Sequence, residues 1–528
     1  MLGYLTSDHA LIAAFAPRAA RRTRHESLAL NRVFKTAPKL ADYFREGEIL
    51  ALKGGLDRPI SGLAIDSRRV VPGNVFFALP GLHIDGANFI DEAMSRGAVA
   101  VVTERMPAHP PAKVTFIHVA RARAALAKVA QRHFGFPDRD MAVAVVAGGS
   151  GKTTVAHLLK HFLQGDQKVG LIGSINYDLG SRTVPSFCTT PESLDTYGMM
   201  ARMREAGCRQ AVLELDSRGI AQGRMLGLRM GAAVFTNLAR DDRTTGASLE
   251  ADLEPIVGLL TGALGCAPSA AVVNLDDPSG ERLLERISAS VRRVTFGEHP
   301  SAQVRAEQIE YGFKKTSFKL VWPEGAMAID SPLIGRCNLG NLLAAVAAAW
   351  SMGRDPFVFL ARMRAFKGVP GRMERIDEGL PFNVVVDLAR TGEALRNSLA
   401  TLRSLTSGRL LVVFGCVGQG DRTQRAARVA VVQQFADFAV ATSDNPRSEP
   451  IGQIFADMQP GAAAPERITW IEDRRRAISL ALAACKPGDC LLVSGKGHEG
   501  YQRLADTVVP FDDRVVIREL IGLKAEIV

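Results

Sequence analysis

Short apolar runs alternate with amphipathic stretches along most of the chain. Apolar runs of a few residues bounded by turn residues indicate buried strands, and apolar residues at helical spacing indicate helices. This alternation predicts an α/β fold with helices covering mostly parallel sheets. The predicted strands are 60–67, 75–79, 98–103, 168–172, 210–215, 232–236, 270–274, 384–387, 410–414, 438–442, 468–471 and 490–494, and the predicted helices include 89–96, 339–352 and 474–484. Residues 304–321 favour antiparallel hairpins instead.

Breaks in this pattern divide the chain into an extension and three α/β units. Residues 1–39 are rich in Ala and Arg and poor in acids, which fits a targeting peptide, a disordered extension, a helical addition or a misplaced start codon. The turn-rich stretch 368–372 separates the last two units. We expect domains at 40–138, 139–371 and 372–528, the last with dinucleotide-fold character.

Composition narrows the class of protein. A chain of 528 residues is too long for one core. Its net charge of +10 suits anionic small molecules such as nucleotides, and without zinc-finger spacing or an aromatic basic ribbon we expect no nucleic-acid partner. No apolar stretch is long enough to predict a membrane span. Seven scattered cysteines are typical of a reducing cytosol, so we expect a cytoplasmic protein.

One segment carries recognisable chemistry. The apolar run 142–146 leads into a glycine-rich turn and then into a helix that begins near Thr153. Backbone N–H groups of such a turn point at phosphates, the lysine can reach the β- and γ-phosphates, and the threonine hydroxyl can bind Mg²⁺. The predicted ATP-binding residues of the loop are Gly148, Gly149, Ser150, Gly151, Lys152, Thr153 and Thr154. Val146 stands where the strict spacing has glycine, so an ordinary strand-to-helix turn is the alternative.

Further motifs follow this loop in an order that resembles the Mur ligases. The motifs are residues 66–73, 85–90, 148–154, 189–193, 234–241, 338–341, 368–374, 444–447 and 495–502. The resemblance covers about residues 40–528. It implies a three-domain architecture: an N-terminal uridine-nucleotide domain, a central P-loop ATPase domain and a C-terminal Rossmann-like domain.

The resemblance also implies a reaction and its residues. Mur ligases use ATP to phosphorylate a carboxylate, which an amine then attacks. The resemblance implies that Lys152 and Glu214 are catalytic, that Thr153 and Glu214 bind Mg²⁺, and that Asn341, Arg372 and Asp387 also contact ATP. It implies UDP-substrate contacts from Ser67, Thr189, Thr190, Ser217, Gln222 and Arg224. It implies amino-acid contacts from Asn445, Arg447, Gly495 and Glu499.

The resemblance is strongest to members that add the third peptide residue to UDP-N-acetylmuramoyl-Ala-Glu in peptidoglycan synthesis. Residues 444–447 are similar to the signature of members that choose meso-diaminopimelate, whose distal carboxylate a guanidinium fork can grip. A turn that closes a strand is the alternative for this segment. The implied partners are the UDP-muramoyl-peptide and the amino acid, and the chain acts either as a monomer or with other cell-wall enzymes.

The departures from the family pattern cluster at the chemistry. The loop replaces polar residues of the family with Ala147, Gly149 and Ser150; family histidines are replaced at 218, 242–246 and 390; Ile256 stands at a metal-site lysine; and Gly420 stands at an arginine that grips the amino acid's carboxylate. Arg422 is a nearby substitute for that arginine.

Three hypotheses follow from these departures. The chain is a working ligase with a rebuilt metal site, a non-catalytic paralogue that binds a nucleotide or a cell-wall precursor, or a ligase for a different acid or amine. In the first case Asp216, Asp242 or a basic residue does the missing work. Arg218, Arg243 and Arg390 add positive charge that can neutralise phosphate directly.

Overall fold

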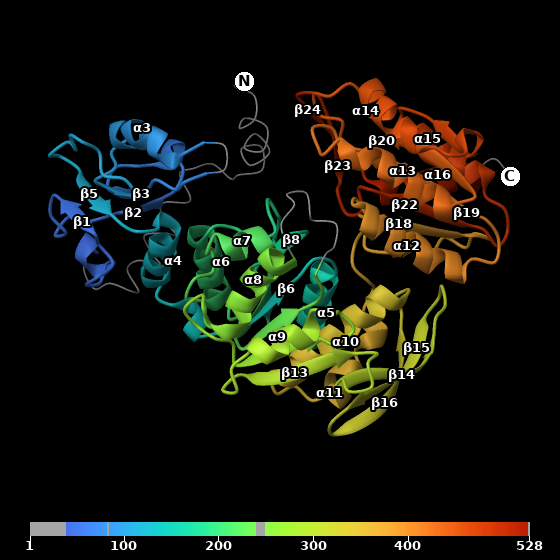
Figure 1. Ribbon diagram of the computed structural model, residues 1–528, viewed down its shortest axis with the longest axis horizontal. Helices are drawn as coiled ribbons and strands as arrows, with labels where there is room; N and C mark the ends of the chain where they lie inside the picture. The colour runs from blue at the N-terminus through green and yellow to red at the C-terminus, as the bar shows by residue number, and fades with distance from the viewer. Residues whose placement is uncertain (1–37, 82–83, 166, 239–248, 526–528) are drawn as a thin grey trace.

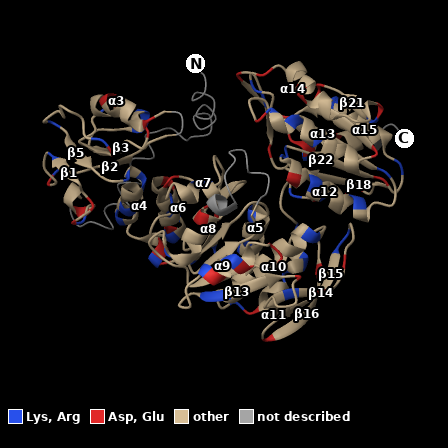
Figure 2. Ribbon diagram, viewed as in Figure 1, with Lys and Arg blue, Asp and Glu red and all other residues tan. Residues whose placement is uncertain are grey.

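The computed structural model describes residues 38–81, 84–165, 167–238 and 249–525. The expectations for residues 1–37 and for Asp242 and Arg243 lie outside the described residues. Three α/β domains follow one another along the chain (Figure 1). Basic and acidic residues are interspersed along the described ribbon of all three (Figure 2).

The N-terminal domain contains a five-stranded sheet in the order β1-β5-β4-β3-β2. Its elements are β1 (Ala51–Lys53), β2 (Gly62–Ala64), β3 (Asn74–Phe77), β4 (Ala100–Thr103), β5 (Thr115–His118), α3 (Ile90–Ser95) and α4 (Ala122–His133). Only β1 runs antiparallel to its neighbour. The side chains of Val75, Phe77 and Ile117 pack under α4 in one core cluster.

The central domain contains an eleven-stranded sheet in the order β16-β15-β14-β13-β12-β11-β6-β10-β7-β8-β9. Its strands are β6 (Ala142–Ala147), β7 (Val169–Ile172), β8 (Asn176–Asp178), β9 (Thr183–Pro185), β10 (Gln210–Leu215), β11 (Ala232–Phe235), β12 (Ala270–Asn274), β13 (Arg292–Gly297), β14 (Val304–Glu310), β15 (Thr316–Trp322) and β16 (Gly325–Ser331). Its helices are α5 (Lys152–Gln164), α6 (Ser193–Glu205), α7 (Ser217–Ala221), α8 (Leu249–Thr261), α9 (Gly280–Arg286), α10 (Arg336–Ser351) and α11 (Pro356–Leu360).

The strand β6 lies at the middle of the parallel part of this sheet, which explains its unbroken apolar sequence. Val146 belongs to the core on the face covered by α5 and α10, and Val145 belongs to the core on the opposite face. Strands covered on both faces read as continuous apolar runs. The loop that follows β6 therefore starts from a rigid position.

The C-terminal domain contains a six-stranded sheet in the order β17-β18-β22-β19-β20-β21 and a separate hairpin of β23 and β24. Its elements are β17 (Glu374–Ile376), β18 (Asn383–Asp387), β19 (Leu410–Cys416), β20 (Phe438–Ser443), β21 (Ile468–Trp470), β22 (Cys490–Ser494), β23 (Tyr501–Leu504), β24 (Thr507–Pro510), α12 (Gly392–Leu405), α13 (Thr423–Phe435), α14 (Ile451–Met458), α15 (Arg474–Ala484) and α16 (Asp513–Ala525). The strands β18, β22, β19, β20 and β21 are parallel, so their carboxyl ends share one edge.

The predicted α/β fold class is confirmed, and the differences are local. The strand expected at 60–67 is only Gly62–Ala64, because the Asp66 carboxylate accepts the N–H of Arg68 and starts a 3-10 turn. The helix expected to begin at 339 begins at Arg336, directly after Gly335. In the described part of the chain, no helix is long and apolar enough to cross a membrane.

Candidate nucleotide and amino-acid sites

The phosphate loop joins β6 to α5 and depends on close backbone approaches. Gly151 precedes α5 with a φ of +84°, and a Cβ atom there would lie 2.1 Å from Asn341 Oδ1. Only glycine fits such a position without strain. Asn341 itself donates to Asn338 Oδ1 at 3.2 Å, so α10 presents the asparagine to the loop. The structure thus brings the predicted loop and Asn341 together.

Residues at the end of β11 hold the loop in place. Asn237 Oδ1 accepts the N–H of Ser150 at 2.9 Å, and Thr236 Oγ1 donates to Ser150 O at 2.8 Å. Lys152 Nζ donates to the carbonyl groups of Gly148 and Gly149, each at 2.7 Å. Among the residues that the structure describes, no side chain caps the start of α5, and an uncapped helix N-terminus suits an anion.

Glu214 connects the phosphate loop to the neighbouring strand ends. It is opposite Val146 in the parallel register and is 1% exposed. Its carboxylate accepts hydrogen bonds from Thr153 Oγ1 at 2.9 Å, Ser174 N at 3.0 Å and Ser174 Oγ at 2.9 Å. Ser174 Oγ also lies 3.0 Å from Thr189 Oγ1. A hydroxyl beside a carboxylate is an oxygen donor set that Mg²⁺ prefers, with phosphate and water as its other ligands.

The residues near the lost metal ligands do not rebuild a protein-only metal centre. Ile256 is 1% exposed within an apolar core cluster. Asp216 Oδ1 accepts the N–H of Gly219 at 2.6 Å and so caps α7, while Arg218 is exposed. Among the described residues, no three His, Cys, Asp or Glu side chains form a metal-binding group. The donor set therefore fits one ion shared with a nucleotide.

Three predicted UDP-substrate residues of the central domain, Thr190, Gln222 and Arg224, take part in one polar network with Glu192. Glu192 Oε1 lies 3.1 Å from Arg123 of α4 and 3.3 Å from Arg224. Arg224 also donates to Gln222 Oε1 at 3.0 Å and to the carbonyl group of Thr190. The network thereby connects the N-terminal domain to the loop before α6.

Two predicted UDP-substrate residues lie apart from this network. Ser217 is exposed at the start of α7. Ser67 belongs to the N-terminal domain, where its hydroxyl donates to Glu92 Oε2 at 2.6 Å.

Arg372 and Asp387 belong to the junction between the last two domains. The Asp387 carboxylate accepts the N–H groups of Met373 at 2.6 Å and Ala389 at 2.8 Å, so it fastens the junction to β18. Burial lowers the pKa of Arg372, whereas the charges of Asp387 and Glu214 raise it. Its neighbour His157 on α5 is kept neutral, because burial lowers the pKa of His157 to about 4. Arg372 Nη1 itself lies 3.3 Å from His498 Nδ1 of the C-terminal domain.

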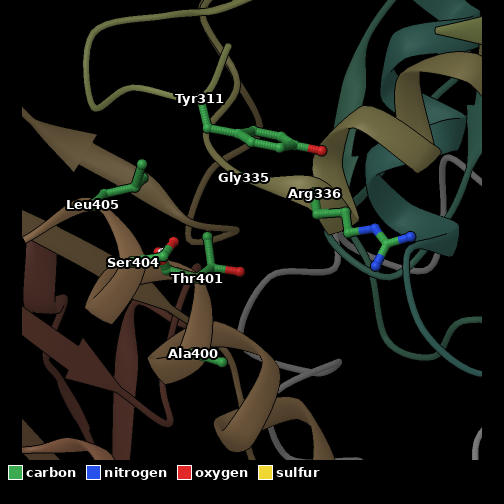
Figure 3. A pocket seen from close by; sticks show the side chains of 7 residues that line it. All are labelled: Tyr311, Gly335, Arg336, Ala400, Thr401, Ser404 and Leu405. Carbon is green, nitrogen blue, oxygen red and sulfur yellow. Dashed lines mark hydrogen bonds between the residues drawn. The ribbon is translucent and has the colours of Figure 1, made fainter. Parts of the chain in front are cut away.

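A hollow of about 260 Å³ lies between the start of α10 and α12 (Figure 3). Tyr311, Arg336 and Thr401 are among its lining residues. Burial and the charge of Glu298 raise the pKa of Tyr311 to about 12, so its hydroxyl stays protonated. The residues assigned to the phosphates do not line it.

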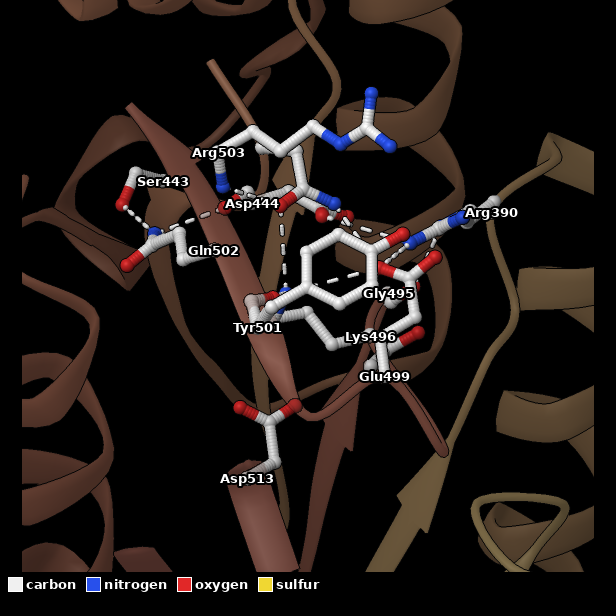
Figure 4. A network of polar contacts seen from close by, with 12 residues as sticks. Arg390, Ser443, Asp444, Gly495, Lys496, Glu499, Tyr501, Gln502, Arg503 and Asp513 are labelled. Atoms are coloured by element: carbon white, nitrogen blue, oxygen red, sulfur yellow. Dashed lines mark hydrogen bonds and ion pairs between the residues drawn. The ribbon is translucent and has the colours of Figure 1, made fainter. Parts of the chain in front are cut away.

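The predicted amino-acid residues gather at the carboxyl edge of the C-terminal sheet (Figure 4). Asn445 Nδ2 donates to Glu499 Oε2 at 3.0 Å, and Gly495 follows β22 directly. Burial raises the pKa of Glu499, but Arg390 and Lys496 outweigh this and keep the pKa below its usual value. Arg447 is exposed at the rim and has a φ of +56°.

Two arginines do not lie where the sequence interpretation places them. Arg390 was expected to neutralise phosphate, but its Nε donates to Gly495 O at 2.7 Å and its Nη2 lies 2.5 Å from Glu499 Oε2. It therefore belongs to the amino-acid edge. Arg422, a suggested carboxylate ligand, forms a two-point ion pair with Asp457 at 2.7 and 2.8 Å. Both corrections have one cause: long side chains pair with the nearest carboxylate, which the sequence does not reveal.

The sequence interpretation missed Ser174 and Asp444. Ser174 lies two residues after β7, the parallel neighbour of β10, and a polar residue close behind a buried strand is the signal that would have indicated it. Asp444 lies within the recognised motif and is 0% exposed, a burial that the motif alone does not indicate.

The comparisons with known proteins agree with this geometry. Residues 59–134 match the family described as Mur ligase family, catalytic domain; residues 146–349 match the Mur ligase middle domain; and residues 371–497 match the Mur ligase, glutamate ligase domain. The chain belongs to the Mur ligase family.

Its relatives include two ligases named for the same substrate. The UDP-N-acetylmuramoyl-L-alanyl-D-glutamate–2,6-diaminopimelate ligase of Solibacter usitatus is 41% identical over 88% of this chain and 93% of its own length. The ligase of that name from Streptomyces coelicolor is 40% identical over 88% and 92%.

Solved structures show the same likeness. A structure of a ligase with that name aligns with a TM-score of 0.67 and 30% identity over 93% of this chain and all of the other. A MurF structure from Acinetobacter baumannii aligns with a TM-score of 0.59 and 18% identity over 89% of this chain and 95% of the other, which shows a shared fold.

Proposed function

We propose that the protein is an ATP-dependent amide ligase that joins a diamino acid, meso-diaminopimelate, to UDP-N-acetylmuramoyl-Ala-Glu in the cytoplasm. The observation that carries the proposal is the contact of Thr153 with Glu214 at the phosphate loop, in a chain whose relatives are named for this reaction. We also propose the domain boundaries 40–138, 139–371 and 372–528.

The reaction transfers the γ-phosphoryl group of ATP to the terminal carboxylate of the UDP-substrate, releasing ADP. The amine then attacks the acyl-phosphate carbon and phosphate leaves. The chain's part is to hold charge: Lys152 and the N-terminus of α5 face the phosphates, and Arg372 adds a third positive group from the junction. Thr153 and Glu214 would hold a Mg²⁺ ion, which would neutralise further phosphate charge.

The two substrates meet only if the C-terminal domain presents its amine to the central domain. Five of the predicted UDP-substrate residues, among them Thr189 beside Ser174, belong to the central domain, and the predicted amino-acid residues belong to the C-terminal domain at the edge of its sheet. The junction that contains Gly371 joins these domains, and the Gly371 backbone packs so closely on the backbone of residues 497–498 that a Cβ would lie 2.1 Å away. Closure about such a junction excludes water from a reactive intermediate.

Turnover with ATP, Mg²⁺, UDP-N-acetylmuramoyl-Ala-Glu and meso-diaminopimelate tests the proposal. We expect phosphate release that needs all components, together with a product of the ligated mass. Glu214→Gln should lower turnover about 10²-fold, because removing one preorganised charge-stabilising group costs that much. Glu205→Gln, an exposed change at the end of α6, is the matched control and should leave turnover unchanged.

A non-catalytic paralogue is the second candidate function. The apolar burial of Ile256 favours it, since that position supplies no ligand for a second metal ion. Binding of ATP and of the UDP-precursor with no phosphate release and no product would establish the paralogue and overturn the ligase.

A further inference from the structure

Arg390 lies where a cation bound at the C-terminal sheet edge would lie (Figure 4). Its Nε donates to Gly495 O at 2.7 Å, and its Nη2 lies 2.5 Å from Glu499 Oε2 and 3.8 Å from Asp444 Oδ1. A carbonyl oxygen and two carboxylates form an acceptor set for a cation. A side chain of the protein itself occupies this set.

Asp444 is the exceptional member of the cluster. It is 0% exposed, and within the described part of the chain no hydrogen-bond donor reaches either of its carboxylate oxygens. Burying an ionised carboxylate without donors is costly, so native structures rarely leave one so. Gly495 makes room for it, because a Cβ there would lie 2.7 Å from Asp444 Oδ2.

The other cations around Asp444 are committed to different partners. Arg474 pairs with Asp513 at 2.7 Å and donates to Ser494 O at 2.9 Å. Lys496 donates to the carbonyl group of Tyr501 and lies 3.5 Å from Asn445 Oδ1 and 3.7 Å from Glu499 Oε2. Arg390 differs from both, because its side chain is 30% exposed whereas theirs are 0% exposed. Of these three cations, Arg390 has the room to change partner.

We propose that Arg390 is a movable internal cation that closes the amino-acid site. In the structure it neutralises Glu499. When an amino acid with a side-chain ammonium enters, the guanidinium moves to Asp444, and the ammonium takes over the contacts with Glu499 and Gly495 O. The inference rests on the proposed function for the class of amino acid.

Electrostatics makes the two positions exclusive. Lys496 Nζ already lies 3.7 Å from Glu499 Oε2, so the guanidinium and a ligand ammonium together would place three cations around one partly buried carboxylate. Their mutual repulsion means that the guanidinium and the ammonium occupy Glu499 in turn. Asp444 provides the guanidinium with a second carboxylate close by. Asn445 stays on Glu499 in both arrangements and keeps that carboxylate in place. The closed arrangement lowers the apparent affinity for the amino acid, since only the open fraction binds it.

Calorimetric titration of meso-diaminopimelate into variants of the full chain tests this exchange. Arg390→Ala should bind the amino acid about tenfold tighter or more, because the competitor is gone. Arg390→Lys keeps the charge and should bind like the wild type. Asp444→Asn should bind several-fold weaker, and Arg390→Ala combined with Asp444→Asn should bind like Arg390→Ala alone. Arg475→Ala, which removes a surface ion pair with Glu519 in the same domain, should change nothing.

A second ligand keeps the test decisive if Asp444→Asn does not fold. The compound 2-aminopimelate has the same carboxylates and one ammonium fewer, so Arg390→Ala should leave its affinity unchanged. Equal or weaker binding of meso-diaminopimelate by Arg390→Ala would overturn the exchange, as would an equal gain for both ligands. The readout is binding, so it is independent of turnover: absent turnover with the expected binding pattern refutes the ligase and not the exchange.

Discussion

The phosphate loop and the C-terminal sheet edge both lie at the carboxyl ends of parallel strands, but different kinds of chemical groups form them. The loop consists of backbone groups and short side chains, and its one carboxylate, Glu214, accepts three hydrogen bonds. The sheet edge consists of long charged side chains, and its buried carboxylate Asp444 accepts none in the described part of the chain. The loop is therefore preorganised, and the edge has a rearrangement available to it.

This difference determines how each site receives a charged ligand. Lys152 in the loop donates to the carbonyl oxygens of Gly148 and Gly149, so the backbone of the loop itself positions this cation. Arg390 at the edge already faces a carboxylate, so an incoming cation must displace it. The amino-acid site therefore already contains a cation of the protein, paired with its carboxylate.

The largest effect is expected at Lys152. Lys152→Ala removes the charge at the loop and should weaken ATP binding by about 10²-fold or more, measured by calorimetry. Lys160→Ala on the same helix removes a lysine that is paired with Asp178 and should leave ATP affinity unchanged. Unchanged ATP affinity in Lys152→Ala would break the contrast, because the loop would then have no special cation.

Backbone precision in the loop is tested at Gly151. Alanine in a left-handed conformation costs about 1–2 kcal/mol, and contact with Asn341 adds to this. We expect Gly151→Ala to lose about 2–4 kcal/mol of unfolding free energy and at least tenfold in ATP affinity. Gly207→Ala is the matched control, with a φ of +88° and nothing within 4 Å of the added Cβ, and should lose only the conformational part. Equal losses in both variants would refute the steric account.

A smaller effect is expected at Glu449, a fully paired carboxylate of the C-terminal domain. The hydrogen bonds of Arg425 lower the pKa of Glu449 to about 2 from its ordinary 4.5, against the opposing effect of burial. This stabilisation is complete above pH 4.5 and disappears as the pH falls towards 2.

Urea unfolding at several pH values measures the effect. Glu449→Gln should lose about 1–3 kcal/mol at pH 7 and show a flatter pH dependence below pH 4.5. Glu466→Gln, an exposed change in the same domain, should follow the wild type. A wild-type slope retained in Glu449→Gln would show that another carboxylate controls acid stability.

The extent to which sequence predicts each region follows from the same contrast. The apolar run 142–146 and the residues after it predict a strand, a turn and a helix, because glycine conformation and helix starts are local properties. Asn341 contacts Gly151 although the two residues are far apart in the sequence, and only the family resemblance indicates that they meet. Local sequence features therefore predict the backbone of the phosphate loop.

At the sheet edge, the sequence does not predict the ion pairs that the structure shows. The motif 444–447 marks the place, but the pairing of Arg390 with Glu499 joins residues from two strand ends separated by more than a hundred positions. A long flexible side chain has several carboxylates within reach, and packing decides among them. The sequence therefore indicates which residues meet at this edge and leaves their pairing undetermined.

The central claim is that the phosphate loop carries phosphoryl transfer to the carboxylate of the UDP-substrate. Hydroxylamine added to the enzyme with ATP, Mg²⁺ and UDP-N-acetylmuramoyl-Ala-Glu, in the absence of amino acid, traps an acyl-phosphate as a hydroxamate that mass spectrometry detects. We predict a hydroxamate that forms with the wild type and with Arg390→Ala and is lost with Lys152→Ala. No hydroxamate from a wild-type protein that binds both ligands would contradict the claim.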